Sequence, residues 1–365
     1  MRKTAIILFL ILFVISLNAI EFNLAHYLSL SGRVYEEDII QSYLARTRYQ
    51  PDLSLTFWQK DFCKLDMQQI ADFALQFNEQ KSENNKDFNL DISAGMYRSW
   101  LRYSAEQYEI RLGLQQINFG TATIHRPLKW FDNIDPRDSR KKTDGVYALL
   151  GKKYFLNNAN LWFWLLKPDD LKSENLFEYI SENVEIGGRI QYPFQYCEAG
   201  FSVHHSNSEI FESETKIGLD LRWDMAIGFW VESSLNIYND RNDKFYSRLF
   251  MLGGDYTLGI GNGIYCLMEH LYFSNMETEL LEPADRSAAT SLLLSYPLGL
   301  FDSVKSIISY NWLSEVESYY LSYNKSYNYL SIYLNLYLNP YSDEVSTIEG
   351  FDEGKSIELM LETKF

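Results

Sequence analysis

The sequence has few of the residues that build metal sites or disulfide frameworks. Three cysteines and five histidines occur among 365 residues. Cys63, Cys197 and Cys266 are odd in number and widely spaced, whereas a disulfide framework uses an even count at closer spacing. No CxxC motif or Cys/His cluster occurs, so we expect no metal and no other cofactor. The thiols are expected to be small strand residues, with one adventitious bridge left open.

Positive charge is also scarce. The chain has 33 Lys and Arg against 49 Asp and Glu, a formal charge of −16. An acidic surface repels phosphates, which argues against a nucleic-acid partner. The sequence also lacks a glycine-rich phosphate loop, an HExxH motif and a nucleophile elbow, so no enzyme class is indicated.

Long apolar runs are missing except at the start. Arg2 and Lys3 precede an apolar run over residues 5–17, and the small residue Ala19 follows. This order is typical of a secretory signal peptide, which we place at residues 1–19. The alternative is a permanent anchor, but a spanning helix needs ~20 apolar residues. If residues 20–365 lie in a membrane, they must form a closed barrel, because no later run could span as a helix.

What the sequence does have is a two-residue period and many aromatic residues, 16% of the chain. Because a strand points alternate side chains to opposite faces, such segments have one hydrocarbon face and one wet face. Lys216–Met225 is an example. Its apolar face consists of Ile217, Leu219, Leu221, Trp223 and Met225, and its wet face consists of Lys216, Gly218, Asp220, Arg222 and Asp224. The same alternation occurs in Tyr329–Asn339, Phe88–Met96 and Leu65–Phe77. Each is near the ~10 residues that a tilted transmembrane strand requires.

The pattern predicts an all-β chain with one domain, a transmembrane antiparallel β-barrel. We expect about 16 strands, with 14 or 18 also possible, because residues 304–339 could hold two strands or three. Turn signals such as Gly253-Gly254 separate the apolar runs. Long polar segments are expected to be outer loops: 78–87, 121–145, 167–183, 239–246, 274–287 and 339–355.

The chain ends on an amphipathic strand, SIELMLETKF at residues 356–365. A terminal strand ending in Phe365 resembles the signal by which the barrel-assembly machinery recognises Gram-negative barrels. The resemblance implies export through the periplasm to the cell outer membrane, with membrane lipids as surroundings. The alternative is a soluble protein that ends on a strand by chance.

A second resemblance lies between residues 111 and 151. RLGLQQINFG, followed by a loop with a Pro-x-Asp step and an Asp-Gly, resembles a pattern of porin-like outer-membrane proteins. The matching residues are Gly113, Gln115, Ile117, Phe119, Gly120, Pro136, Asp138, Asp144 and Gly145. Many relatives have Trp at Phe119 and Asn-Pro at Arg126-Pro127, so no substrate is implied. In general diffusion porins the loop at this place folds inward, and porins often trimerise, so a homotrimer is possible.

The loop 121–145 also has a physical reason to fold inward. By our count it follows the fifth strand, and Trp130 and Phe131 are too apolar to be left exposed together. An inward loop would bury this pair and place both charge signs across the pore. The alternative is a rim loop held by its own Arg–Asp pairs. The candidates for a pore constriction are Arg126, Lys129, Asp132, Asp135, Arg137, Asp138, Arg140, Lys141 and Lys142.

The wet faces of the strands supply candidates for the lumen lining. These are Asp91, Arg111, Gln115, Lys216, Asp220, Arg222 and Asp224. Opposite charges along one face could also pair and close the interior. A barrel of ~16 strands, however, has more interior volume than side chains fill. This consideration favours a hydrated channel.

The sequence therefore predicts a porin-like channel for passive diffusion of small hydrophilic solutes. One alternative is a closed barrel that serves as a structural anchor or adhesin and does not conduct. A further alternative is an outer-membrane lipase, because His204 and Ser206 resemble the His-x-Ser-Asn of outer-membrane phospholipases. Both residues fall on the wet face of their strand, whereas such an enzyme must present this pair to lipid.

Overall fold

The computed structural model consists of antiparallel β-strands. It describes residues 21–37, 40–81, 86–138, 142–167, 185–207, 211–240, 243–278, 280, 286–339 and 354–365. The predicted signal peptide at 1–19 lies outside these residues. No helix in the described part of the chain could span a bilayer. The strands are β1 Glu21–Glu37, β2 Ile40–Lys60, β3 Cys63–Lys81, β4 Lys86–Ser104, β5 Tyr108–Gln115, β6 Val146–Tyr154, β7 Asn160–Leu166, β8 Glu185–Pro193, β9 Glu198–Ser206, β10 Ser213–Asp224, β11 Gly228–Asp240, β12 Asp243–Leu258, β13 Ile264–Glu277, β14 Arg286–Pro297, β15 Asp302–Asn311, β16 Val316–Ser326, β17 Leu330–Asn339 and β18 Gly354–Lys364.

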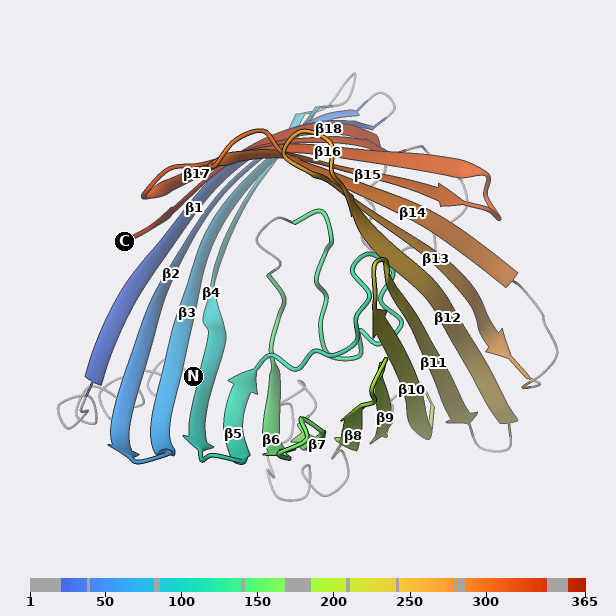
Figure 1. Cartoon of the computed structure of the whole chain (residues 1–365). Coiled ribbons are helices and arrows are strands. Elements are labelled where there is room, and N and C mark those ends of the chain that lie inside the picture. Colours follow the sequence, from blue (N-terminus) through green and yellow to red (C-terminus); the bar gives the residue numbers. More distant parts are fainter. Residues whose placement is uncertain are drawn as a thin grey trace.

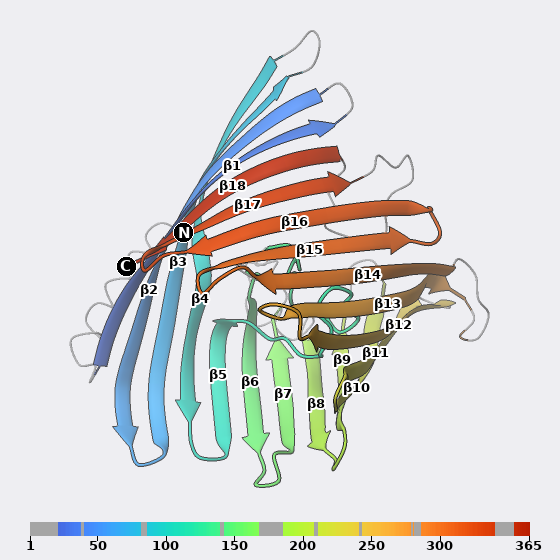
Figure 2. The same ribbon diagram turned by 45° about the horizontal axis from the view of Figure 1, so that its top comes forward.

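The sheet closes on itself. Each strand pairs with its sequence neighbours, and β1 pairs with β18 from Tyr27↔Lys364 to Glu36↔Lys355 (Figures 1 and 2). Closure leaves no edge along this seam, as a barrel in hydrocarbon requires. The barrel has 18 strands instead of the favoured 16, at the upper limit of the predicted range. One source of the difference is residues 304–339, which contribute to three strands, β15, β16 and β17.

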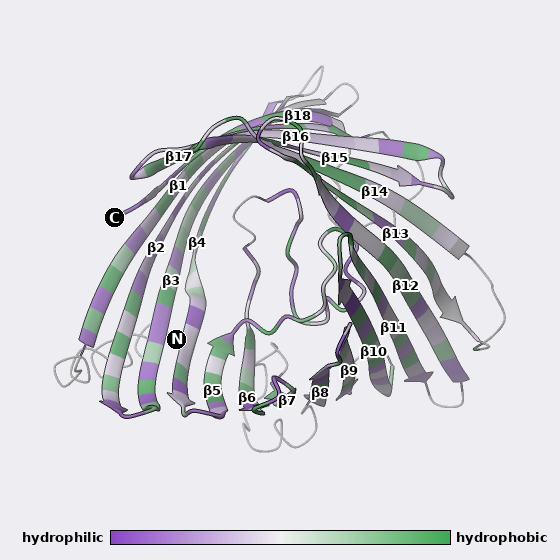
Figure 3. Ribbon diagram, in the orientation of Figure 1, coloured by the Kyte–Doolittle hydropathy of each residue, from purple (hydrophilic) through white to green (hydrophobic). Residues whose placement is uncertain are grey.

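The predicted alternation of faces is confirmed in the strands. On β10, Leu219 is exposed on the outside, while Asp220 is buried on the inside. On β17, Leu334 and Leu338 face outward, and Asn335 faces inward. Figure 3 shows the resulting bands of hydrophobic and hydrophilic residues along the strands.

The longest connections between the strands all lie at the same end of the barrel. At one end, here called the turn end, short connections such as residues 61–62 and 105–107 join the strands, and Phe365 lies there. At the other end, the loop end, lie the connections within all six segments that we predicted as outer loops. Much of these segments lies outside the described residues. Outer-membrane barrels have their short turns on the periplasmic side.

The inner face is not polar throughout. One buried cluster covers the inside of β11 to β17, namely Trp230, Met251, Leu267, Leu293, Ile307, Tyr320 and Tyr337, with Ile124 added from the β5–β6 connection. A second cluster joins Phe119 and Leu128 of that connection to the inside of β6 and β7. These inward apolar groups are exceptions to the predicted polar inner face. The described part of the β5–β6 connection packs against them: Ile124 lies in the first cluster, and Phe119 and Leu128 lie in the second.

Candidate functional site

The β5–β6 connection, residues 116–145, runs inside the barrel and is called the inner loop here (Figure 1). The inner loop follows the fifth strand, as predicted, and residues 139–141 of it lie outside the described part of the chain. Gly120 is needed where the loop turns inward. Its φ is +92°, and a Cβ there would lie 2.5 Å from the Glu232 carboxylate. Any other residue at position 120 would strain the backbone and displace this carboxylate.

Two buried carboxylates hold the first part of the inner loop against β11 and β13. Glu232 accepts hydrogen bonds from the backbone N–H of Thr121 and of Ala122, the latter at 2.7 Å. Glu269 accepts the backbone N–H groups of the next three residues, Thr123 to His125, at 2.7–2.8 Å. Five consecutive backbone donors thus satisfy two carboxylates that would be costly to bury alone.

The side chains of the same segment extend the anchor to β14 and β15. Ile124 packs into the apolar cluster on the inside of β11 to β17, which we call the covered wall. The His125 imidazole contacts the Ser291 hydroxyl at 2.8 Å, and Ser291 contacts Ser309 at 2.6 Å. His125 lies in the loop and not in a strand, and burial lowers its pKa from the ordinary 6.5 to about 4. The imidazole is therefore neutral at neutral pH.

An aromatic group fixes the middle of the inner loop. Phe119 and Phe131 pack on Trp164 of β7 with ring centroids 5.7 and 5.5 Å away. Trp130 packs edge-on against Phe119, and its indole N–H donates to Ser234 of β11 at 3.2 Å. The inward fold therefore half-buries the pair Trp130 and Phe131, which was the physical reason to expect it.

The last part of the inner loop crosses to the other side of the barrel. The Tyr320 hydroxyl of β16 donates to the Arg137 carbonyl at 2.6 Å. Lys142 then donates to Gln50 of β2 at 2.8 Å. Arg98 of β4 donates to the Thr143 carbonyl at 2.7 Å. The loop is thus fastened to strands on opposite sides of the barrel, which places it across the interior.

The predicted constriction residues are largely engaged with one another. Arg126 forms a two-pronged ion pair with Asp132, whose side chain is fully buried. Arg137 pairs with Asp135 at 2.9 Å. The Asp138 N–H donates to the Asp135 carbonyl at 3.1 Å. The loop's own Arg–Asp pairs, which the rim-loop alternative required, thus occur in a loop that folds inward.

The four remaining candidates of this set differ in their placement. Lys129 is exposed. Lys142, besides its bond to Gln50, lies 3.7 Å from Glu362 of β18. Arg140 and Lys141 lie outside the described residues. The exposed charge of the described loop therefore comes from few side chains.

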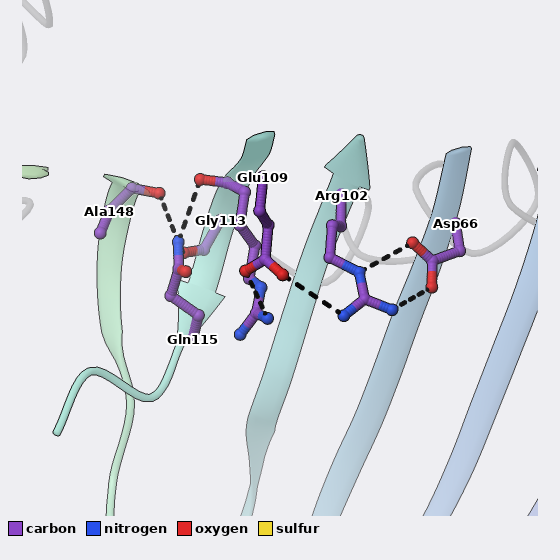
Figure 4. A network of polar contacts seen from close by, with 7 residues as sticks. Asp66, Arg102, Glu109, Gly113, Gln115 and Ala148 are labelled. Carbon is purple, nitrogen blue, oxygen red and sulfur yellow. Dashed lines mark hydrogen bonds and ion pairs between the residues drawn. The ribbon is translucent and has the colours of Figure 1, made fainter. Parts of the chain in front are cut away.

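A row of ion pairs lines the inner face of β2 to β5, which we call the open wall. Arg102 binds Asp66 through two hydrogen bonds of 3.0 and 2.6 Å and approaches Glu109 at 3.8 Å (Figure 4). Glu109 in turn holds Arg111 at 2.9 Å. Nearer the loop end of the same wall, Arg48 binds Asp72 at 2.6 Å. Asp66 is buried, but Arg102, Glu109 and Arg111 are partly exposed, unlike the carboxylates under the inner loop.

The predicted lumen residues fall into three groups. Arg111 and Lys216 face inward in partly exposed ion pairs, the second with Glu214 at 3.4 Å. Gln115 and Asp220 also face inward but are buried. Gln115 donates to the Ala148 carbonyl at 2.9 Å (Figure 4). Asp220 pairs with Arg189 at 2.6 Å. The remaining three are exposed, with Asp91 on β4 and with Arg222 and Asp224 as a pair at the turn end of β10.

The pair His204 and Ser206 faces the inside of β9, as its phase predicted. His204 is only 2% exposed and sits between the Trp164 indole, at 3.3 Å, and the Glu185 carboxylate, at 3.2 Å. The ring of Phe131 covers it at a centroid distance of 4.9 Å. Ser206 is buried as well. This position is an internal one beneath the inner loop.

Phe365 lies at the turn end, where it extends the pairing of β18 with β1. Its backbone exchanges two hydrogen bonds with His26 of β1, of 2.8 and 3.0 Å, and the two rings stack at 5.2 Å. The ring stays 63% exposed. Its role as an assembly signal remains a prediction.

Sequence reasoning missed the residues that hold the inner loop. Glu232 and Glu269 stand alone in apolar strand segments, GFWVESSL and CLMEHLYF. A carboxylate in the inward phase between apolar neighbours was the signal available. Its partners lie 110 and more residues away in the sequence, so the pattern could not identify them.

Comparison with known proteins supports the fold alone. No protein-family model matches the sequence, and no curated protein does. Solved outer-membrane structures do match in shape. OccK7 (OpdD) of Pseudomonas aeruginosa has a TM-score of 0.61 and 11% identity over 94% of this chain and 99% of its own. OccAB1 of Acinetobacter baumannii has a TM-score of 0.63 and 7% identity, and the match covers 94% of this chain and 96% of OccAB1. An anion-selective porin of Comamonas acidovorans has a TM-score of 0.51 and 12% identity over 94% of this chain and 99% of its own. The chain thus has the closed-barrel fold of Gram-negative porins.

Proposed function

We propose that this protein is an outer-membrane porin through which small hydrophilic solutes diffuse passively. The observation that carries the proposal is the inner loop, which is fastened across the interior while the open wall keeps partly exposed charges. Such an arrangement narrows a pore without filling it and lets size and field select the solute. The fold shared with solved porins supports the same reading.

The residues that would border the solute path are few. From the inner loop these are Lys129 and Lys142, and from the open wall Arg102, Arg111 and Glu109. Arg126, Asp132, Asp135 and Arg137 would shape the loop instead, because their charges are paired within it. The constriction would therefore be set by backbone and ion pairs more than by free charges.

Single-channel recording of refolded protein in planar bilayers tests the proposal. We expect discrete conductance steps. A protein that inserts without any steps would overturn the channel and leave the closed anchor or adhesin. Outer-membrane lipids, the barrel-assembly machinery and a homotrimer belong to the same proposal, and chemical crosslinking in native membranes tests the trimer.

We also propose that the protein has no enzymatic activity. The geometry of His204 and Ser206 supports this, because both are buried inside the barrel beneath the inner loop. The test is phospholipid cleavage by detergent-solubilised protein. Activity that the Ser206→Ala change abolishes would overturn this part of the proposal.

A further inference from the structure

An apolar groove lies on the outside of the barrel at its turn end. It is lined by Phe301 of the β14–β15 turn, by Ser326 at the end of β16, by residues 327–329 of the β16–β17 turn, and by Leu330 and Ile332 of β17. The two turns are joined by a hydrogen bond from the Ser326 N–H to the Phe301 carbonyl, 2.7 Å long. The groove measures about 660 Å³, in the usual range of small-ligand sites, ~300–1,000 Å³.

The groove opens toward the lipid side. On β16, Tyr320 and Ser322 are buried inside, so Tyr319 and Leu321 face outward and so does Lys325. On β17, Tyr333 and Asn335 are inside, and Leu330, Ile332 and Leu334 therefore form the outer face. Aromatic rings at Phe301, Tyr327 and Tyr329 border the groove, and in membrane proteins such rings are enriched at the bilayer surface.

Two opposite charges stand beside this groove on the same outer face. Lys325 pairs in register with both Ile332 of β17 and Asp302 of β15. Its ammonium lies 5.7 Å from the centre of the Tyr327 ring. Asp302 accepts a 3.5 Å hydrogen bond from the Tyr323 hydroxyl. The structure records no ion pair between these two described side chains, so a cation and an anion are presented side by side.

We propose that this groove binds one glycerophospholipid with a zwitterionic, ethanolamine-type headgroup. An acyl chain lies along Phe301, Tyr327, Leu330 and Ile332, where it removes apolar surface from water. The phosphate meets Lys325, and the headgroup ammonium meets Asp302. An anionic headgroup lacks the second match, because it would face the Asp302 carboxylate. This inference rests on the membrane placement of the proposed function.

A lysine on aromatic rings elsewhere at the turn end provides the matched control. Lys153 of β6 faces outward and lies 5.3 Å from the Tyr108 ring centre and 5.0 Å from that of Phe155. In register, Lys153 pairs with Tyr108 of β5 and with Leu161 of β7. It therefore has the cation and the rings without a carboxylate opposite it on either neighbouring strand.

Native mass spectrometry of detergent-solubilised protein, mixed with equal dioleoyl phosphatidylethanolamine and dioleoyl phosphatidylglycerol, tests the site. We expect one tightly held phosphatidylethanolamine on the wild type and on Lys153→Gln. Tyr327→Ala and Lys325→Gln should each weaken its retention by about tenfold, and Asp302→Asn should remove the preference between the two lipids. Equal losses in Lys153→Gln, or unchanged retention in the groove variants, would overturn the groove. Preference for phosphatidylglycerol in the wild type would overturn the zwitterionic headgroup.

Conductance of the same variants separates this inference from the proposed function. The groove lies outside the barrel, so each variant should conduct as the wild type does. Wild-type protein that conducts but retains no lipid would contradict the lipid site and leave the channel proposal intact. A barrel that holds the lipid yet never conducts would sink the channel alone.

Discussion

The inside of this barrel has two unlike walls. On the open wall, β2 to β5, arginines and carboxylates alternate in ion pairs, some of which are partly exposed, such as Arg111 with Glu109. On the covered wall, β11 to β17, each strand contributes an inward apolar side chain to a buried cluster, and Ser and Asn side chains are buried in neighbouring inward positions. The carboxylates Glu232 and Glu269 of the same wall are buried under the inner loop. The difference shows which surface is built for water and which for another part of the chain.

The largest test of this comparison is removal of an anchor on the covered wall. Glu269→Ala would leave three buried backbone N–H groups without their acceptor, at ~1–3 kcal/mol each where water cannot replace it. We expect a release of the inner loop, a larger single-channel conductance and a loss of about 3–6 kcal/mol in stability against urea. Glu214→Ala, which breaks a partly exposed pair with Lys216, is the control and should cost below ~1 kcal/mol. Equal effects of the two changes would contradict the distinction between the walls.

The pH dependence of the covered wall comes next in size. The pKa of His125 is lowered to about 4, so the unfolded chain takes up a proton between pH 6.5 and 4 while the folded chain does not. Stability is therefore full above pH 6.5 and falls as the pH drops to about 4, by at most ~3 kcal/mol. Urea unfolding at pH 7 and pH 4 should show this loss, and His125→Gln should reduce it. His205→Gln, on the outer face, is the control and should leave the loss unchanged.

Removal of an aromatic contact under the inner loop should have a smaller effect. Trp130→Ala deletes a half-buried ring and its bond to Ser234, for which about 2 kcal/mol is expected, below the ~3–5 kcal/mol of a fully buried Trp. Trp130→Phe should retain most of the packing and lose the hydrogen bond alone. Urea midpoints in micelles measure both changes. Equal losses would show that the hydrogen bond, and not the packing, holds this part of the loop.

The smallest expected effect concerns the open wall. Asp66→Asn would leave Arg102 with one carboxylate neighbour fewer and should favour anions, whereas Arg102→Gln should favour cations. One charge at ~10 Å in water is worth ~0.4 kcal/mol, so each permeability ratio should change about twofold. Reversal potentials in a salt gradient give the ratio. Arg222→Gln, at the exposed turn end of β10, should change it less.

Much of the fold followed from the sequence because the barrel is built from a local rule. Alternation in segments such as Lys216–Met225 assigned inward and outward faces correctly, and the inner loop followed the fifth strand as counted. The strand number was predicted only as a range. The connections between β15, β16 and β17 are short, and a two-residue pattern does not separate such strands well. Strand faces depend on neighbours in the chain, and these are visible in a sequence.

The candidate site was predicted only in part, since its contacts are long-range. Trp130 and Phe131 indicated that the loop would turn inward, but Met251, Leu267 and Ile307 gave no sign that they would line its resting place. These residues lie in segments apolar on both faces, such as RLFMLGG, which appear as breaks in the alternation. The sequence of such a run does not indicate which other segment will cover its inner side.

The sequence by itself determined that this chain forms a closed sheet with hydrocarbon outside, because side-chain direction in a strand is set by position parity. Only the tertiary structure decided which inward residues face water. Glu232 and Glu269 meet backbone donors more than 100 residues away, whereas Asp66 and Glu109 both meet Arg102 on the strand beside their own and remain near the lumen. The choice depends on where one loop lies, and that position results from many distant contacts acting together.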